Sequence, residues 1–452
     1  MMLEKLADRR WDEVRAALLD MHPSEAADAI EKLPAGERTV AYRLLPEAAA
    51  SDVFGYLDST TQQSIINNLG KREVAAILDD MSPDDRTFFL EKLPPHVLKE
   101  TLNLLSDEGR SVASSLLGYE KNSVGRLMTP YYIQARPGWT VDETFAHIRE
   151  FGRKAETLNI VYVVNREQQL IDDVRIGDLL MARPETRVEE LMDNRFIALP
   201  DTMDREEAVE MFRKYDRTAL PVITGNGVLV GIVTVDDILD VAAAEATEDI
   251  QKFGGVEALD LPYTETPLPE MVRKRAGWLI ILFFGEMMTA SAMGYYDKQI
   301  EKAVVLALFV PLIISSGGNS GSQAATLIIR AMSLKELTLR DWWYVMKREI
   351  FSGFTLGVIL GVIGFARIAI WQKLGLFDYS EHWPLVALTI FFSLIGIVLW
   401  GTLTGSMIPF ILKRFGFDPA TSSAPFVATL VDVTGLIIYF SIAVAVLTGT
   451  LL

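Results

Sequence analysis

The chain of 452 residues contains no cysteine and only four histidines. Disulfide bonds and thiolate metal sites are therefore excluded, and a zinc site is not expected. Motifs that mark hydrolase and nucleotide-processing active sites, such as His-Glu-x-x-His, Gly-x-Ser-x-Gly and the phosphate-binding loop, are also missing. We therefore expect that the chain is not an enzyme. Its polar start, Met1–Lys5, gives no sign of a cleavable signal peptide.

The chain also has no excess of basic residues, as its net charge of −17 shows. Residues 272–452 hold 14 Lys and Arg against 10 Asp and Glu, which leaves 29 basic and 50 acidic residues in 1–271 and a net charge of −21 there. Nucleic acid needs basic partners, so we expect no nucleic-acid ligand. An acidic surplus suits either cation binding or plain solubility, and charge alone leaves both open.

Residues 1–125 carry short amphipathic helical segments that are separated by proline. Pro23, Pro46 and Pro83 stand at expected helix starts, and acidic residues follow each of them, as helix N-termini prefer. Glu31–Pro34 recurs as Glu91–Pro94. This repetition predicts an all-α superhelical N-terminal domain that serves as a scaffold.

Residues 126–250 alternate strand-like and helical runs and repeat themselves, because Leu170–Asp178 returns as Leu229–Asp237. This α/β block resembles a tandem pair of CBS motifs, a family whose pairs form regulatory domains that often bind adenine nucleotides. The second copy keeps the family's Gly-x-x-Thr-x-x-Asp with Thr234 and Asp237, whereas the first copy has Asp172 in place of the glycine. The resemblance implies a nucleotide such as ATP at Thr234 and Asp237. In the alternative interpretation, the pair of CBS motifs binds no nucleotide and only folds and dimerises.

Acidic residues cluster at the end of this block. Asp237, Asp240, Glu245 and Glu248 follow the spacing i, i+3, i+8 and i+11, which is roughly one helical face. Like charges on one face repel unless cations neutralise them. A solvated helix surface is the ordinary explanation, and a cation site is the alternative. Residues 251–275, which include three prolines, are expected to form a connecting, plug-like helix and a linker into the membrane.

Residues 276–452 are expected to form an all-α transmembrane domain with five helices. Basic residues gather before the first span, between the second and third, and between the fourth and fifth. The positive-inside rule therefore places the N-terminal domains in the cytoplasm and the C-terminus outside. The expected spans are Ala276–Tyr296, Val304–Met332, Ile350–Lys373, Trp383–Leu412 and Ser423–Leu451.

The fifth span contains a single acidic residue, Asp432. It lies roughly 14 Å from a helix start at Ser423, near a bilayer midplane. A charge there costs roughly 2.5–3.5 kcal/mol and normally faces a bundle interior or a water-filled path. The second span has small and polar residues over 315–326, which cannot face lipid and must pack closely or line water. The amides Asn319 and Gln323 favour a lined path.

The order of these parts resembles the MgtE family of bacterial magnesium transporters and channels. The most specific similarities are Gly317–Gln323 and Val427–Gly435. The resemblance implies a homodimer in the lipid bilayer of the bacterial inner membrane, with a Mg²⁺ pore on the dimer axis. The pore residues that it implies are Asp432, Ala428, Gly435 and Asn319.

The resemblance also implies that Mg²⁺ bound among cytoplasmic acids holds the channel shut, because the ion bridges groups that otherwise repel. The chain departs from the family at Phe88, where the pattern can carry a second acid, so the number of regulatory ions stays open. The positions implied for regulatory Mg²⁺ are Asp84, Asp204, Glu206, Asp216, Asp237, Asp240, Glu245, Glu248, Asp249 and Asp418.

Two other functions stay open at this point. A proton- or sodium-coupled carrier for Mg²⁺, Co²⁺ or another divalent cation would use membrane acids such as Glu286 and Glu301 as coupling groups. The second open function is a nucleotide sensor whose membrane part only anchors it. The polar second span argues against an anchor, because an anchor needs no amides within the bilayer.

Overall fold

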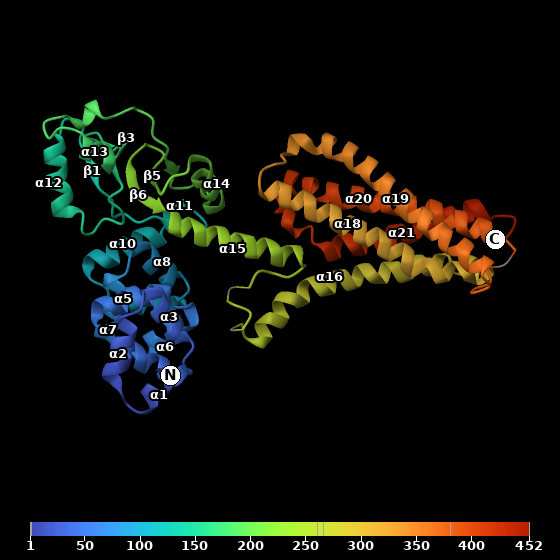
Figure 1. The fold of residues 1–452 in the computed structure, drawn as a ribbon, viewed down its shortest axis with the longest axis horizontal. Helices are drawn as coiled ribbons and strands as arrows, with labels where there is room; N and C mark the ends of the chain where they lie inside the picture. The colour runs from blue at the N-terminus through green and yellow to red at the C-terminus, as the bar shows by residue number, and fades with distance from the viewer. Residues whose placement is uncertain (1, 260, 265, 380, 452) are drawn as a thin grey trace. The chain divides into compact units, whose positions relative to one another are not determined.

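The computed structural model describes residues 2–259, 261–264, 266–379 and 381–451. The chain divides into two compact units, Met1–Glu245 and Ala246–Leu452. Figure 1 shows the helices and strands of both units. The first unit combines helices with small sheets, and the second is helical.

Short helices open the first unit. Pro23, Pro83 and Pro95 occupy their first turns, where a missing N–H costs nothing. The Ser82 and Ser106 side chains cap α8 and α10 by accepting backbone N–H bonds. The helices are α1 (Met2–Ala7), α2 (Trp11–Leu19), α3 (Pro23–Glu31), α4 (Ala35–Arg43), α5 (Glu47–Tyr56), α6 (Ser59–Asn68), α7 (Lys71–Asp80), α8 (Pro83–Glu91), α9 (Pro95–Leu102) and α10 (Asp107–Leu117).

These helices share one apolar core, in which Tyr42, Phe54 and Phe89 are almost fully buried. The Phe54 ring meets the Tyr42 and Phe89 rings edge to face, at centroid distances of 6.1 and 5.5 Å. The all-α superhelical domain expected for the start of the chain is confirmed.

The repeated α/β block folds as two small sheets of the same topology within the described residues. In each sheet a short strand pairs in parallel with a central strand, and the central strand pairs antiparallel with the third. The elements are α11 (Val124–Leu127), β1 (Gln134–Ala135), α12 (Val141–Phe151), β2 (Ile160–Val164), β3 (Leu170–Arg175), α13 (Ile176–Met181), η1 (Val188–Glu190), β4 (Leu199–Pro200), α14 (Arg205–Tyr215), β5 (Ala219–Ile223) and β6 (Leu229–Thr234). The internal repeat therefore corresponds to a structural repeat.

The acidic run after β6 forms one continuous helix, α15 (Val235–Phe253). Gly255 then adopts a left-handed conformation with φ of 72°, which a side chain would disfavour, and the chain turns there. The next long helix, α16, begins at Leu268. Within the described part of 251–275, where a connecting helix and a linker are expected, the end of α15 and the start of α16 are helical, and a turn and loop join them.

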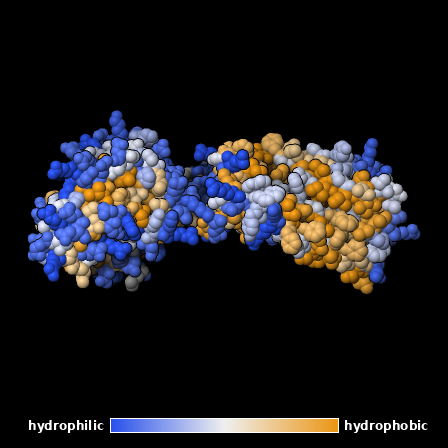
Figure 2. All heavy atoms as spheres, turned by 90° about the horizontal axis from the view of Figure 1, so that it is seen from above, coloured by the Kyte–Doolittle hydropathy of each residue, from blue (hydrophilic) through white to orange (hydrophobic). Residues whose placement is uncertain are grey.

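Among the described residues, five helices are long and apolar enough to cross a membrane, as expected. Figure 2 shows hydrophobic side chains over much of the drawn face of the second unit. The elements of this unit are α16 (Leu268–Tyr295), α17 (Asp297–Lys302), η2 (Val304–Phe309), α18 (Val310–Ser333), η3 (Leu339–Asp341), α19 (Trp342–Lys373), α20 (Trp383–Arg414), η4 (Pro419–Thr421) and α21 (Ala424–Leu447).

Two helix starts differ from the expected spans. The first helix begins at Leu268 rather than Ala276, and the third begins at Trp342 rather than Ile350. The added turns are polar or amphipathic, and in α19 the Lys347 ammonium lies 5.1 Å from the Trp343 ring centroid. Hydropathy marks the apolar part of a helix, whereas hydrogen bonding continues into the interfacial turns.

Glycine allows the membrane helices to approach one another closely. Gly353, Gly357, Gly361 and Gly364 form a buried stripe on α19 that faces α20. A Cβ atom added to Gly357 would lie 2.7 Å from the Ile395 Cα atom, so no side chain fits there. The remaining side of α20 packs against α18 and α21, which carry the candidate site.

Candidate functional site

Asp432 lies on α21 at its contact with α18. A Cβ atom built on Gly318 of α18 would lie 3.4 Å from Ala428 Cβ and 3.7 Å from Asp432 Oδ1. Ala428 and Asp432 are both half-buried. The structure therefore brings these two expected pore residues together beside the small residues of the second span.

Gly435, the other expected pore residue of α21, and Tyr439, one turn beyond it, are buried within the second unit. Gly435 is buried, and a Cβ atom there would lie 3.6 Å from Ile397 on α20. The Tyr439 side chain is fully buried, and its hydroxyl donates to the Leu306 carbonyl oxygen at 2.9 Å. The structure does not place Gly435 on the half-buried surface that includes Asp432.

One face of α18 is polar and exposed in the single chain. Ser315, Asn319, Gln323 and Thr326 follow the spacing i, i+4, i+8 and i+11, and all four are exposed. The Asn319 amide lies 3.3 Å from the Ser315 hydroxyl, to which it donates. We refer to these four residues as the polar stripe.

The buried side of α18 consists mainly of small residues. Gly317 and Gly321 pack against Ile397, Gly401 and Val431 of α20 and α21. The small and polar run of the second span therefore separates into two faces, one that packs against other helices and one that is exposed in the single chain.

Glu286 of α16 adds an acid that sequence reasoning could not place. Gly285 sits directly against Thr429 of α21, and the Glu286 carboxyl lies within hydrogen-bonding reach of Asp432. The sequence marks Glu286 as an acid in a span, but a contact between the first and fifth spans leaves no local signal.

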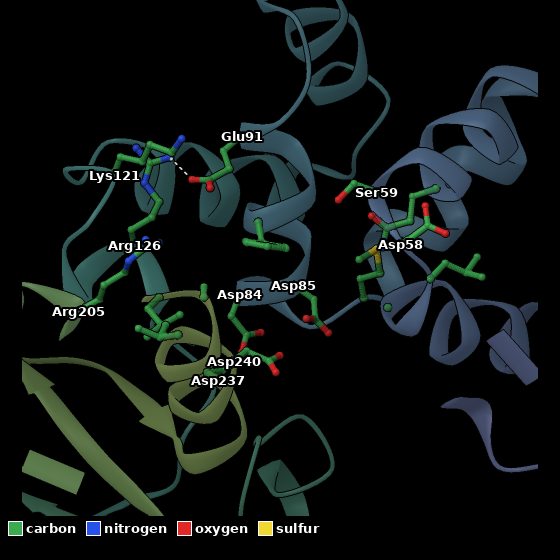
Figure 3. A pocket seen from close by; sticks show the side chains of 18 of the residues that line it. Asp58, Ser59, Asp84, Asp85, Glu91, Lys121, Arg126, Arg205, Asp237 and Asp240 are labelled. Carbon is green, nitrogen blue, oxygen red and sulfur yellow. Dashed lines mark ion pairs between the residues drawn. The ribbon is translucent and has the colours of Figure 1, made fainter. Parts of the chain in front are cut away.

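A second candidate site is a cavity of about 300 Å³ in the first unit. Asp84 and Asp85 reach it from α8, and Asp237 and Asp240 reach it from α15 (Figure 3). Asp84 is buried, and its Oδ1 atom has no hydrogen-bond partner among the described residues. We refer to these four residues as the acidic pocket.

Burial and mutual repulsion disfavour ionisation in the acidic pocket. Burial first, and then the charge of Asp84, raises the pKa of Asp237 to about 9, although the Thr234 hydroxyl donates to Asp237 at 2.8 Å. Burial and the Asp236 charge also raise the pKa of Asp240. A cation that enters the pocket would remove these costs.

Positively charged groups line the other part of the same cavity. Figure 3 shows Lys121, Arg126 and Arg205 there, and Arg126 lies 3.7 Å from Glu91. The Arg205 guanidinium forms an ion pair with Glu245 at 2.9 Å. Glu245 is therefore already neutralised by an internal cation.

Phe88, the position at which the family pattern can carry a second acid, lines this cavity. Its side chain is 56% exposed, and the Lys92 ammonium lies 3.5 Å from the ring centroid. An aromatic ring supplies no oxygen ligand, so the α8 contribution to the cavity rests on Asp84 and Asp85.

Three of the expected regulatory acids lie at the two ends of α14. Asp204 caps its start by accepting from the Glu206 backbone N–H at 2.8 Å. Asp216 ends the helix in the left-handed conformation, with φ of 51°. Eleven residues of helix span about 16 Å, so the structure does not bring Asp216 together with Asp204 and Glu206.

The remaining expected acids surround Lys252 in the second unit. The Lys252 ammonium lies 2.6 Å from Glu248 and 2.7 Å from Asp418. Burial lowers the pKa of Lys252, but hydrogen bonds and charge from both carboxylates outweigh this and raise it overall. Asp249 accepts from the Ser333 hydroxyl at 3.1 Å, and burial raises the pKa of Asp249.

In the part of the chain that the structure describes, no three His, Asp or Glu side chains are arranged to hold a metal ion. The expected regulatory acids instead lie in the acidic pocket, at the ends of α14, in the ion pair of Glu245 with Arg205, and around Lys252. We refer to Lys252, Glu248, Asp249 and Asp418 as the Lys252 group.

The possible nucleotide residues have structural contacts of their own. Thr234 is buried and bonds Asp237, and a Cβ atom on Gly231 would lie 2.7 Å from the Met128 sulfur. Gly231 is thus required for packing. In the first copy Asp172 is fully buried and accepts the backbone N–H groups of Asp173 and Asn194, both at 2.9 Å.

Family models match three parts of the chain. They describe an MgtE intracellular N domain over residues 21–122, a CBS domain over 188–244 and a divalent cation transporter over 310–442. The chain is 38% identical to the magnesium transporter MgtE of Thermus thermophilus, over 95% of this chain and 94% of that protein. The chain belongs to the MgtE family of magnesium transporters.

Further similarities agree with this membership. The magnesium transporter MgtE of Bacillus subtilis is 31% identical over 97% of this chain and 95% of its own length. The chain also matches a crystal structure described as the cytosolic domain of the Mg²⁺ channel MgtE in complex with ATP. The match covers 53% of this chain and 98% of the chain in that crystal structure. It has 34% identity and a TM-score of 0.51. The expected resemblance to MgtE is confirmed, and so are the fold class and the expectation that the chain is not an enzyme.

Proposed function

We propose that this member of the MgtE family is a Mg²⁺-selective channel for magnesium uptake that cytoplasmic Mg²⁺ closes. It works as a homodimer in the bacterial inner membrane, with its pore on the two-fold axis between the α18 and α21 helices. The observation that carries the proposal is the exposed polar stripe of α18 beside the half-buried Asp432.

The polar stripe needs a partner because hydrocarbon cannot satisfy its amides and hydroxyls. A second copy supplies one if the stripes face each other across a water-filled path. The symmetry then brings two Asp432 carboxylates to the same depth. Mg²⁺ dehydrates reluctantly, so two carboxylates, the Ala428 backbone and the Asn319 amide would bind the ion through its waters.

The cytoplasmic acids form the sensor in this proposal. Without Mg²⁺ the acids of the acidic pocket repel one another, and in the Lys252 group Glu248 and Asp418 share the single Lys252 ammonium. The buried Asp84 Oδ1 atom has no hydrogen-bond partner among the residues that the structure describes, and a divalent ion would supply one. Mg²⁺ that binds the closed state better than the open state shifts the population toward closure.

ATP is a further proposed ligand of the CBS pair. The support is the relative whose cytosolic domain was solved with ATP, together with Thr234 and Asp237 at the second copy. The basic ends of the spans support cytoplasmic N-terminal domains and a C-terminus outside.

Mg²⁺ flux into liposomes tests the pore. Asp432→Asn should abolish flux, because the amide cannot neutralise a divalent ion at membrane depth. Asp378→Asn, which removes the same charge outside the spans, should keep normal flux. Undiminished flux in Asp432→Asn would refute the pore assignment.

Closure has a separate test. The triple variant Glu245→Gln, Glu248→Gln and Asp249→Asn should conduct at Mg²⁺ concentrations that close the unaltered protein. A matched control neutralises three exposed acids elsewhere in the first unit, namely Glu150, Glu167 and Glu185. Normal closure in the first variant would contradict the proposed sensor.

A further inference from the structure

Glu286 lies in the first span between apolar residues and is exposed in the single chain. Among the described residues, it forms no ion pair. A carboxyl group at this depth cannot face lipid without a large cost, so it must meet water, a cation or a proton. Glu286 is not among the pore residues proposed above.

The packing of α16 on α21 sets the position of Glu286. A Cβ atom on Gly285 would collide with Thr429, so the two helices touch there with no space to spare. Asp432 follows Thr429 by three residues and therefore lies on the same side of α21. Trp278 and Phe426 form a second contact of these helices, with ring centroids 6.5 Å apart. The Glu286 carboxyl accordingly reaches Asp432.

A neighbouring hydroxyl extends this polar surface. Thr289 is one turn along α16 from Glu286, on the same side of the helix. Its side chain is 9% exposed, and its hydroxyl has no hydrogen-bond partner in the described part of the chain. A buried hydroxyl without a protein partner usually bonds to water or a ligand, and the water shell of a hydrated ion would provide that bond.

We infer that Glu286 supplies a second carboxylate to the ion path at Asp432 and thereby sets the affinity for divalent cations and their preference over monovalent ones. This inference rests on the proposed function. In the homodimer, four carboxylates rather than two would face the permeating ion. Each added negative charge attracts a divalent ion twice as strongly as a monovalent one.

The test compares Glu286→Gln, Glu286→Asp and the unaltered full-length chain in liposomes that contain no Mg²⁺. The half-saturating Mg²⁺ concentration for flux should rise at least about tenfold in Glu286→Gln, because one of two adjacent charges is lost. K⁺ permeation relative to Mg²⁺ should rise as well. Glu286→Asp keeps the charge and should lie between the two. Glu381→Gln, in the loop outside the spans, is the matched control.

Unaltered half-saturation and ion preference in Glu286→Gln would overturn the inference. If Asp432→Asn is inactive in the same assay, the proposed pore stands without a role for Glu286. If Asp432→Asn also conducts normally, the proposed function itself fails. Should Glu286→Gln not fold, Glu286→Ala takes its place, since normal half-saturation in that charge-free variant overturns the inference too.

Discussion

The contact between α18 and α20 predicts a large effect from one methyl group. Gly405 of α20 faces Gly321 of α18. A Cβ atom at position 405 would lie 2.8 Å from the Gly321 carbonyl carbon and 3.0 Å from its Cα atom, and closer still to its carbonyl oxygen. These neighbours are backbone atoms, so no side-chain rotation can relieve the overlap in Gly405→Ala.

The magnitude follows from the distances. Carbon atoms in contact prefer separations of about 3.5–4.0 Å, so the helices would have to part by roughly 1 Å. Overpacking of this kind costs about 1–3 kcal/mol. Alanine recovers about 0.5–1 kcal/mol because it is the better helix former. We therefore expect a net loss of about 0.5–2 kcal/mol in the free energy of unfolding.

The displacement of α18 in Gly405→Ala should also change the ion path. Gly321 is one turn from Gly318, which contacts Ala428 and Asp432. A displaced α18 would carry the polar stripe away from Asp432, and Mg²⁺ flux should fall together with stability. A substitution that acted on stability alone would leave the flux of the folded fraction unchanged.

The assay is the thermal unfolding midpoint of the full chain in detergent, paired with Mg²⁺ flux in liposomes. Gly277→Ala is the control, because the nearest atom to a Cβ there is Glu257 Oε1 at 3.6 Å, an ordinary contact. That variant should be as stable as the unaltered chain or slightly more so. Equal midpoints for Gly405→Ala and Gly277→Ala would refute the packing argument.

Three further predictions concern the cytoplasmic acids. Phe88→Asp should lower the Mg²⁺ concentration that halves flux by about tenfold, because it adds a carboxylate to the acidic pocket; an unchanged value would exclude this pocket from sensing. Burial raises the pKa of Asp237 from 3.8 to about 9. The Mg²⁺-free first unit should therefore lose stability as pH rises between those values, by at most about 1.4 kcal/mol per pH unit. Pulse proteolysis should show that Asp237→Asn lacks this slope, and an equal slope would contradict the assignment. Lys252→Met should also lower the closing Mg²⁺ concentration in the flux assay, because Mg²⁺ no longer competes with an ammonium for Glu248 and Asp418; a raised concentration would argue against that competition.

The sequence of the second span predicts much of its structure. Its small and polar residues predicted either close packing or a lined path, and the structure contains both. Gly317 and Gly321 face α20 and α21, whereas Asn319 and Gln323 are exposed. A helical period of 3.6 residues separates these two sets, so the division could be obtained from sequence.

Other features depend on contacts between segments that are distant in the chain, so the sequence alone does not predict them. Glu286 stands in a span without a local partner, and only the packing of Gly285 on Thr429 brings it to Asp432. Similarly, the buried Gly435 faces Ile397 because of the rotation of α21 in the bundle, which the apolar sequence around it does not encode.

In the proposed sensor, too, contacts with distant residues change what the sequence of α15 predicts. In sequence its acids form one repelling face, which predicts a strong demand for cations. In the structure Arg205 pairs with Glu245, and Lys252 pairs with Glu248. The chain thus neutralises part of that face itself. Mg²⁺ would have to displace or outweigh these internal cations, which would place closure at higher Mg²⁺ concentrations than the count of acids suggests.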